Sequence, residues 1–252
     1  DSTWTVEVAE LLAAGRDLAE LPRVGPWIAA QLTAILEEPP EPAEPPPLRA
    51  GFRTWTASSE SAMRFEGPVR GDLQTHTVWS DGHSTVGEMA VAARDRGYDY
   101  LLLTEHSKGL PIAGGLDEER LRAHRRELDL VSPEAGIRLL QGLEMNIDPQ
   151  GDGDMEPAAL AELDVILGAF HSKLRLKDDQ TERYLAALRN PWVDVLAHPR
   201  CRIWNFRLGL WADWPRVFRE AAALDKAVEV DGYADRQDLD LDLVRIAGEL
   251  SL

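Results

Sequence analysis

Histidine and carboxylate side chains recur directly after short apolar runs in this 252-residue sequence. Imidazole nitrogens and carboxylate oxygens are ligands for Zn, Mn and Fe in proteins, and a carboxylate can bridge two ions. One such residue after one run would mean little, but the pattern repeats over successive runs. We therefore expect the four histidines that follow such runs, His76, His106, His171 and His198, to converge with nearby carboxylates on a shared metal site.

The apolar runs alternate with amphipathic segments of helical period from Val69 onward. This alternation is typical of βα units around a mostly parallel sheet, either a barrel or an open doubly wound sheet. In a βα barrel the carboxyl ends of the strands meet at one face, where active sites are built. The side chains that follow the runs would therefore converge. The expected strands end at Leu73 and within 100–103, 137–140, 165–167, 193–196 and 227–230, and the expected helices cover 86–96, 118–130, 157–163, 182–189 and 214–224.

Two of the six histidines do not follow an apolar run. His83 comes after an Asp-Gly pair and is expected to be a loop residue. His124 lies within a helical segment beside several arginines, which predicts a solvated side chain. The single cysteine, Cys201, is interpreted as a small neutral residue, and it cannot form an internal disulfide. A reducing, cytoplasmic location is therefore expected.

The formal net charge of −17 argues against broad binding to nucleic acid, which needs clustered lysine and arginine, although it leaves room for a local basic site. An acidic chain fits either carboxylates gathered around cations or solubility alone. The first residues show no leader and no apolar run long enough for a membrane span. A Gly-rich phosphate loop and a Gly-x-Ser-x-Gly motif are both missing from the sequence, which excludes two common catalytic designs.

Three regions are expected along the chain. Residues 1–38 have a helical pattern, and the stretch 21–29 resembles a helix-hairpin-helix in which Arg23 replaces the first glycine. Acidic residues outnumber basic ones there, so a helical pair packed on the barrel or on a neighbour is the alternative to DNA binding. Residues 39–67 form a Pro-rich linker and a wrapping segment with Phe52, Trp55 and Phe65 as anchors. Residues 68–252 form the metal-binding barrel.

Five motifs in order carry a family resemblance: Gly71 to Gly82, Thr104 to Lys108, Gly142 to Glu144, Phe170 to Ser172 and Ala197 to Arg200. Together they resemble the PHP (polymerase and histidinol phosphatase) superfamily, and most closely the PHP domain of bacterial family X DNA polymerases. The resemblance covers about Val69 to the end of the chain. It implies an α/β fold, a distorted seven-stranded βα barrel that holds up to three divalent cations.

The resemblance also implies how the cations would be shared. His76 and Glu144 would bind the first, and Glu144 would bridge to a second that His171 and His198 hold. Asp81 and His106 would bind the third, and Asp231 would line the pocket. Gln74 replaces the first histidine of the family's His-x-His motif, so either the first cation is bound more weakly or Gln74 is not a ligand.

Two further departures from the family pattern concern Glu105 and the end of the chain. Glu105 stands where the family has an aspartate, and we expect this change to be mild. The chain ends at Leu252, before the seventh strand and the Ser/Thr-Asp-x-His motif that supplies two ligands. Truncation is the favoured explanation, because a barrel without its closing strand would leave an exposed edge.

The predicted function is hydrolysis of phosphate esters by a metal-bound water, with two or three Zn, Mn or Fe ions as cofactors. Gln74 and Asp231 are further candidates for catalytic residues. Lys108, Arg175 and Arg200 are expected to hold phosphate oxygens, with ordinary surface charge as the alternative. The expected partner is a small phosphate ester, whereas the acidic charge disfavours DNA and no membrane is expected. A 3′–5′ exonuclease on DNA ends and a non-catalytic metal-bound scaffold are the alternatives.

Overall fold

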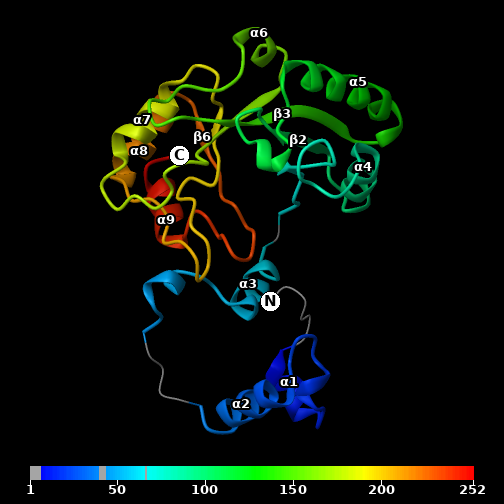
Figure 1. Ribbon diagram of the computed structural model, residues 1–252, viewed down its shortest axis with the longest axis vertical. Coiled ribbons are helices and arrows are strands. Elements are labelled where there is room, and N and C mark those ends of the chain that lie inside the picture. Colours follow the sequence, from blue (N-terminus) through cyan, green and yellow to red (C-terminus); the bar gives the residue numbers. More distant parts are fainter. Residues whose placement is uncertain (1–6, 40–43, 66) are drawn as a thin grey trace. The chain divides into compact units, whose positions relative to one another are not determined.

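The computed structural model describes residues 7–39, 44–65 and 67–252, and its contacts divide the chain into two compact units, Asp1–Pro46 and Pro47–Leu252 (Figure 1). Parts of the expected N-terminal helix, the Pro-rich linker and the wrapping segment (residues 1–6, 40–43 and 66) lie outside the described residues.

The first unit is a small helical body. It contains α1 (Val8–Ala13), the short 3-10 helix η1 (Leu18–Glu20) and α2 (Pro26–Glu37). Asp17 caps η1 by accepting a hydrogen bond from the backbone N–H of Ala19, and Pro26 occupies the first turn of α2. Its core is formed by Leu11, Leu18, Val24 and Ala29. The helix-hairpin-helix interpretation of this unit stays a prediction.

The second unit begins with η2 (Pro47–Arg49) and α3 (Trp55–Ala62). The prediction that Phe52 anchors this segment is confirmed, because its ring lies 5.1 Å from that of Trp204 and 3.9 Å from the Arg202 guanidinium. The same prediction was wrong for Trp55 and Phe65, whose exposed fractions are 76% and 64%. Helix α3 buries none of its side chains, and Trp55 at its first position lies at the rim of a cavity rather than in the core.

A six-stranded sheet forms the body of the second unit, and every neighbouring pair of strands is parallel in the order β1 to β6. The sheet forms a half-barrel, and β1 and β6 each pair on one side only among the strands that the structure describes. This arrangement confirms the expected parallel α/β fold. The strands are β1 (Gly71–Thr75), β2 (Tyr100–His106), β3 (Arg138–Asn146), β4 (Val165–Ala169), β5 (Val195–Leu196) and β6 (Ala227–Val228).

Helices connect the strands, as the sequence pattern predicts. Helix α4 begins at a capping box, in which Thr85 and Glu88 satisfy each other's backbone N–H groups. Helix α5 begins after the cap Asp117 and continues past Pro133 to Ala135, five residues beyond its expected end at Leu130. The helices of this unit are α4 (Val86–Asp95), η3 (Pro111–Ala113), α5 (Glu118–Ala135), α6 (Pro157–Leu160), α7 (Thr181–Arg189), α8 (Trp214–Ala223) and α9 (Leu241–Glu249).

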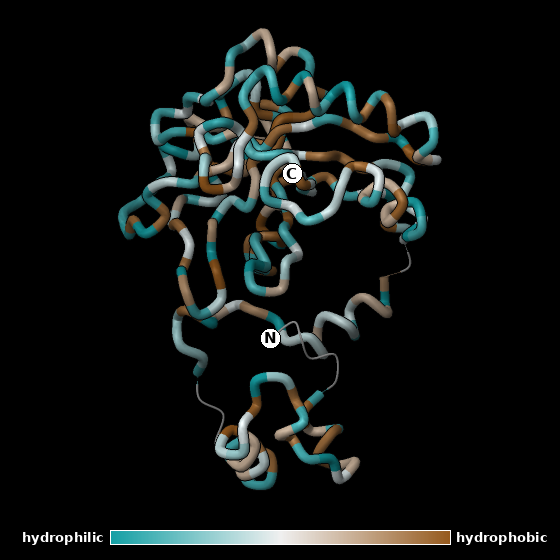
Figure 2. The backbone as a smooth tube through the Cα atoms, turned by 45° about the vertical axis from the view of Figure 1, so that its right-hand side comes forward, coloured by the Kyte–Doolittle hydropathy of each residue, from teal (hydrophilic) through white to brown (hydrophobic). Residues whose placement is uncertain are grey.

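Side chains alternate between the two faces of the strands, and this alternation positions the site. In β2, Leu101 and Leu103 pack in a cluster with α4 and α5, whereas Leu102 packs on the opposite face with residues of β4 and β5. Because the alternation continues along β2, Glu105 lies on the helix-covered face and His106 lies on the inner face. Figure 2 shows hydrophobic stretches (brown) along extended segments of this unit and alternating hydrophilic and hydrophobic residues along its helices.

Candidate active site

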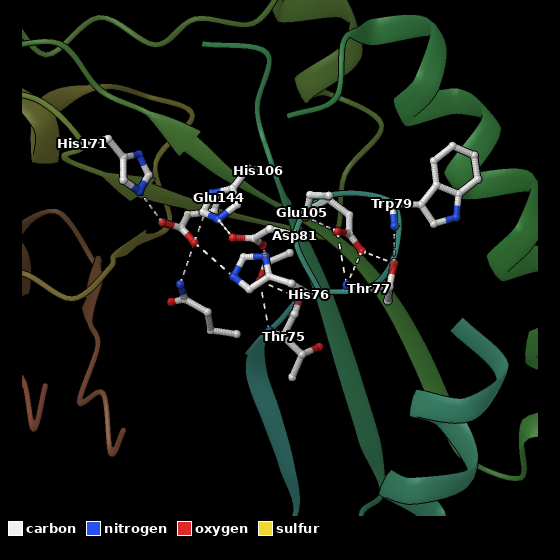
Figure 3. Close-up of polar contacts among 12 residues, drawn as sticks. Thr75, His76, Thr77, Trp79, Asp81, Glu105, His106, Glu144 and His171 are labelled. Atoms are coloured by element: carbon white, nitrogen blue, oxygen red, sulfur yellow. Dashed lines mark hydrogen bonds and ion pairs between the residues drawn. The ribbon is translucent and has the colours of Figure 1, made fainter. Parts of the chain in front are cut away.

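Glu144 lies at the centre of the side chains that the sequence singles out (Figure 3). It stands near the carboxyl end of β3, in register with His106 of β2, and its exposed fraction is 1%. Its Oε1 is 2.9 Å from His171 Nε2 and 2.8 Å from His198 Nε2. Its Oε2 is 3.3 Å from His76 Nε2 and 3.6 Å from His106 Nδ1. The four imidazoles therefore surround one carboxylate, as expected for strands whose carboxyl ends meet at one face.

Asp81 extends the cluster toward solvent. Its carboxylate is 3.5 Å from His106 Nε2 and 4.0 Å from His76 Nδ1. The rings of His76 and His106 stack with centroids 4.5 Å apart and planes 14° apart. Among the described residues, two groups have ligand atoms within 4.8 Å of one another, His76–Asp81–His106 and His106–Glu144–His171, so each group could hold a cation.

The loop that carries His76 and Asp81 is held by a tight turn and by Glu105. The carbonyl of Thr77 accepts hydrogen bonds from Ser80 and Gly82, and a Cβ at Gly82 would lie 2.4 Å from the His76 carbonyl oxygen. Glu105 accepts hydrogen bonds from the backbone N–H and hydroxyl of Thr77, and from the Ser80 hydroxyl. The loop is therefore fixed from the helix-covered face of β2.

Charge in the cluster is shared between Glu144 and the imidazoles. Burial alone would raise the pKa of Glu144, but the charge of His198 and hydrogen bonds with His171, His198 and His76 hold it well below its usual value. Burial likewise opposes the charged form of His198 and of His76, and Glu144 nevertheless raises the pKa of both. Burial lowers the pKa of His106, and the charges of His76 and His171 contribute to the lowering.

The donor set fits a divalent cation. Three of the buried side-chain atoms that have no hydrogen-bond partner among the described residues lie in this cluster: the Nδ1 atoms of His76 and His106, and Oε1 of Gln74. Buried polar atoms without partners are costly, so their concentration beside a buried carboxylate indicates a place for an ion. The Nε2 of Gln74 donates to Glu144 Oε2 over 2.8 Å, which leaves its amide oxygen as a potential ligand atom.

A cavity of about 1130 Å³ opens onto the cluster and is lined by all six expected metal ligands. Gln74 and Asp231 also line it. Sequence reasoning missed Tyr233 and Arg236 in this lining, because the short loop after β6 carries no pattern that would place them there. The Nε of Arg236 is 3.9 Å from the Asp231 carboxylate.

The three expected phosphate-binding cations lie outside this cavity. Lys108 forms an ion pair of 2.6 Å with Glu118. Arg175 and Arg200 instead line a separate cavity of about 760 Å³, in which Arg175 lies 4.6 Å above the ring of Phe206 and Arg200 pairs with Asp240.

The remaining sequence expectations concern His83, His124 and Cys201. His83 is an exposed loop residue, as predicted. The prediction of a solvated His124 was wrong, because its side chain faces Glu105 and Gln141 in the interior and is fully buried. Cys201 is buried, with Sγ 3.8 Å from His198 Nδ1. No described helix has the length and apolar character needed to cross a membrane.

The chain has homologues among known proteins. The chain is 35% identical over 201 residues to the DNA polymerase/3′-5′ exonuclease PolX of Bacillus subtilis, a match that covers 79% of this chain and 35% of PolX. It is 37% identical over 174 residues to a probable phosphatase of Acetivibrio thermocellus, with 65% of each chain covered. It is 31% identical over 166 residues to a probable phosphatase of Photobacterium profundum, with 64% of this chain and 63% of that protein covered.

No family model matches the chain. The chain spans about a third of the length of PolX and somewhat less than two thirds of the two phosphatases. The matched homologues and the ordered motifs at the strand ends agree. The chain is homologous to PolX and to these phosphatases, which is consistent with the PHP superfamily and with the PHP domain of the family X DNA polymerases.

Proposed function

We propose that this protein hydrolyses phosphate esters with two or three divalent cations, Zn, Mn or Fe. The observation that carries the proposal is the position of Glu144. This buried carboxylate contacts three imidazoles and lies beside three buried nitrogen and oxygen atoms that have no hydrogen-bond partner and could bind a cation. Homology to a polymerase–exonuclease and to probable phosphatases supports the same chemistry. The proposed ligands are His76, Asp81, His106, Glu144, His171 and His198.

The positions of Glu144 and His171 suggest a separate role for each. Glu144 bridges the cluster, because Oε1 faces His171 and His198 while Oε2 faces His76. When bound, divalent cations lower the pKa of a water and offset the negative charge of a phosphate group. The Nδ1 of His171 contacts the amide oxygen of Asn146, which fixes the orientation of the ring.

In this proposal, Arg236 binds the phosphate group of the substrate. It lines the same cavity as the cluster, whereas Lys108 is engaged by Glu118. A guanidinium can hold two phosphate oxygens at once, and the contact with Asp231 at 3.9 Å is loose enough to be exchanged for a phosphate. Asp231 would then orient Arg236 rather than bind a cation.

The test is hydrolysis of para-nitrophenyl phosphate by protein loaded in turn with Zn, Mn and Fe. We expect His171→Ala to abolish turnover while the far-UV circular dichroism spectrum stays unchanged. His83→Ala is the matched control, because it removes an exposed imidazole outside the cavity and should turn over like the wild type. If fully metal-loaded His171→Ala turned over as fast as the wild type, the proposed role of His171 as a metal ligand would be refuted. A loaded wild-type protein without any turnover would instead indicate a scaffold.

Homology to PolX favours one second candidate, a 3′–5′ exonuclease on DNA ends. The two candidates differ in the product that they release. Phosphate release from para-nitrophenyl phosphate without nucleotide release from single-stranded DNA supports a small-molecule phosphatase. Nucleotide release from a 3′ end supports the exonuclease.

A further inference from the structure

A second cavity, which we call the basic pocket, gathers cations in this otherwise acidic chain. Its volume is about 760 Å³, and its lining includes five cationic side chains and two carboxylates, Asp240 and Asp242. Such a local excess of positive charge stands out against a net charge of −17. The basic pocket is defined here by Arg175, Lys177, Arg200, Arg207, Phe206 and Trp211.

The positive charge of the basic pocket is only partly neutralised. Within the described part of the chain, no carboxylate forms an ion pair with Arg175 or Lys177. The Nε atom of Arg200 is buried and has no acceptor. Burial lowers the pKa of Arg207, and the charges of Arg236 and Arg175 lower it further. Five cationic side chains against two carboxylates in one cavity make a site that an anion would stabilise.

Aromatic rings stand beside these cations. Phe206 and Trp211 have exposed fractions of 55% and 58%, and the guanidinium of Arg175 lies 4.6 Å above the Phe206 ring. Exposed aromatic rings along a cationic groove are typical of sites for single-stranded nucleic acid, in which bases stack and phosphates pair with cations. A simple anion would not need the rings.

The basic pocket is connected to the Glu144 cluster by the chain and by a third cavity. The loop after β4 carries both His171 and Arg175, and the loop after β5 carries both His198 and Arg200. The third cavity, of about 340 Å³, shares Gly51 and Asp240 with the basic pocket. It also shares Val230, Asp231 and Gly232 with the cavity at the cluster. The three cavities therefore adjoin in series.

We propose that the basic pocket is a subsite for a nucleotide unit of a single-stranded nucleic acid whose end reaches the Glu144 cluster. The guanidinium groups and Lys177 pair with phosphates, and Phe206 and Trp211 stack on bases. Cleavage of that strand rests on the proposed phosphoesterase function, but binding in the basic pocket does not. A substrate of this length needs all three cavities, whereas a small phosphate ester needs only the one at the cluster.

The test measures binding of a fluorescein-labelled oligothymidylate of roughly ten nucleotides by fluorescence anisotropy, with the protein in a chelator so that no turnover occurs. We expect Arg175→Ala/Lys177→Ala to weaken binding about tenfold or more, and to reduce the slope of log K against log salt by about 1.4. Trp211→Ala should weaken binding about tenfold through lost stacking. Arg122→Ala/Arg126→Ala removes two exposed cations of α5 outside the three cavities and is the matched control.

Three results would overturn the inference: no binding by the wild type, equal losses in the basic-pocket and control variants, or binding of thymidine monophosphate as tight as that of the strand. The last result would assign the pocket to a free nucleotide. Hydrolysis of para-nitrophenyl phosphate is measured in parallel on the metal-loaded wild type. If the metal-loaded protein does not hydrolyse para-nitrophenyl phosphate but the strand still binds, only the proposed function is contradicted. If hydrolysis occurs but the strand does not bind, only the proposal for the basic pocket is contradicted.

Discussion

His124 Nε2 on α5 lies 3.8 Å from Glu105 Oε1 on β2, and both side chains are fully buried. Glu105 also binds Thr77 and Ser80, so the loop that carries His76 and Asp81 is attached to the side of β2 opposite the cluster. The geometry of the proposed metal site therefore depends on a buried polar network that contains none of its proposed ligands.

The variant Glu105→Gln tests this dependence. An amide keeps one acceptor oxygen, but its NH₂ group cannot accept from Thr77 or Ser80. We expect the free energy of unfolding to fall by about 1–3 kcal/mol. Metal affinity should fall about tenfold or more, because groups that orient ligands affect binding to that extent. Urea denaturation and calorimetric titration with Zn or Mn measure the two effects. Glu119→Gln, at an exposed position of α5, is the control, and equal metal affinity in both variants would contradict the dependence.

The buried imidazole of His124 predicts a pH dependence of stability. Burial, with a smaller contribution from the charge of Arg125, lowers its pKa to about 4 in the folded protein. The unfolded chain has a pKa of about 6.5 and binds the proton first, so this contribution to stability is complete above pH ~6.5 and is lost as pH falls toward ~4. Its size is about 3 kcal/mol.

His124→Asn isolates the contribution, because asparagine does not titrate. We expect the free energy of unfolding of the variant to fall less steeply between pH ~6.5 and ~4 than that of the wild type. Urea denaturation of both proteins across this range gives the two slopes. Identical slopes would mean that His124 is not the group responsible.

Metal binding should release protons. In the metal-free protein, contact with Glu144 raises the pKa of His76 and of His198 above the usual value, in spite of their burial. A cation needs these imidazoles neutral, so it must displace their protons. Proton release should therefore grow, and apparent metal affinity should fall, as pH decreases. Calorimetric titration in buffers of different ionisation enthalpy measures the release, and an enthalpy that is the same in every buffer would rule it out.

The strand ends and the convergence of their side chains were predictable because a parallel sheet places the carboxyl ends of its strands together. Predicting that these side chains converge near Glu144 required only the order of the βα units along the chain. Arg236 could not be predicted in the same way, since it follows β6 in a loop whose position depends on tertiary contacts such as the hydrogen bond of its carbonyl with Arg202.

The error at His124 has a different origin. Its sequence neighbours are arginines, and this composition suggests an exposed position. Helical spacing instead places His124 three residues after Leu121 and four before Leu128, both of which are buried. The signal was therefore present in the sequence, but the polarity of the neighbours obscured it.

Gln74 offers the last prediction, because it occupies a ligand position of the family motif with a weaker donor. Its Nε2 donates to Glu144 Oε2 over 2.8 Å, and its buried Oε1 has no partner. Gln74→Leu should lower metal affinity if that oxygen is a ligand. Gln74→His supplies an imidazole, which transition metals bind better than an amide, so affinity for Zn should rise about tenfold. Competition with a chromophoric chelator measures both variants. If Gln74→Leu binds Zn as the wild type does and Gln74→His binds no better, then Gln74 only orients Glu144 through its hydrogen bond and contributes no ligand.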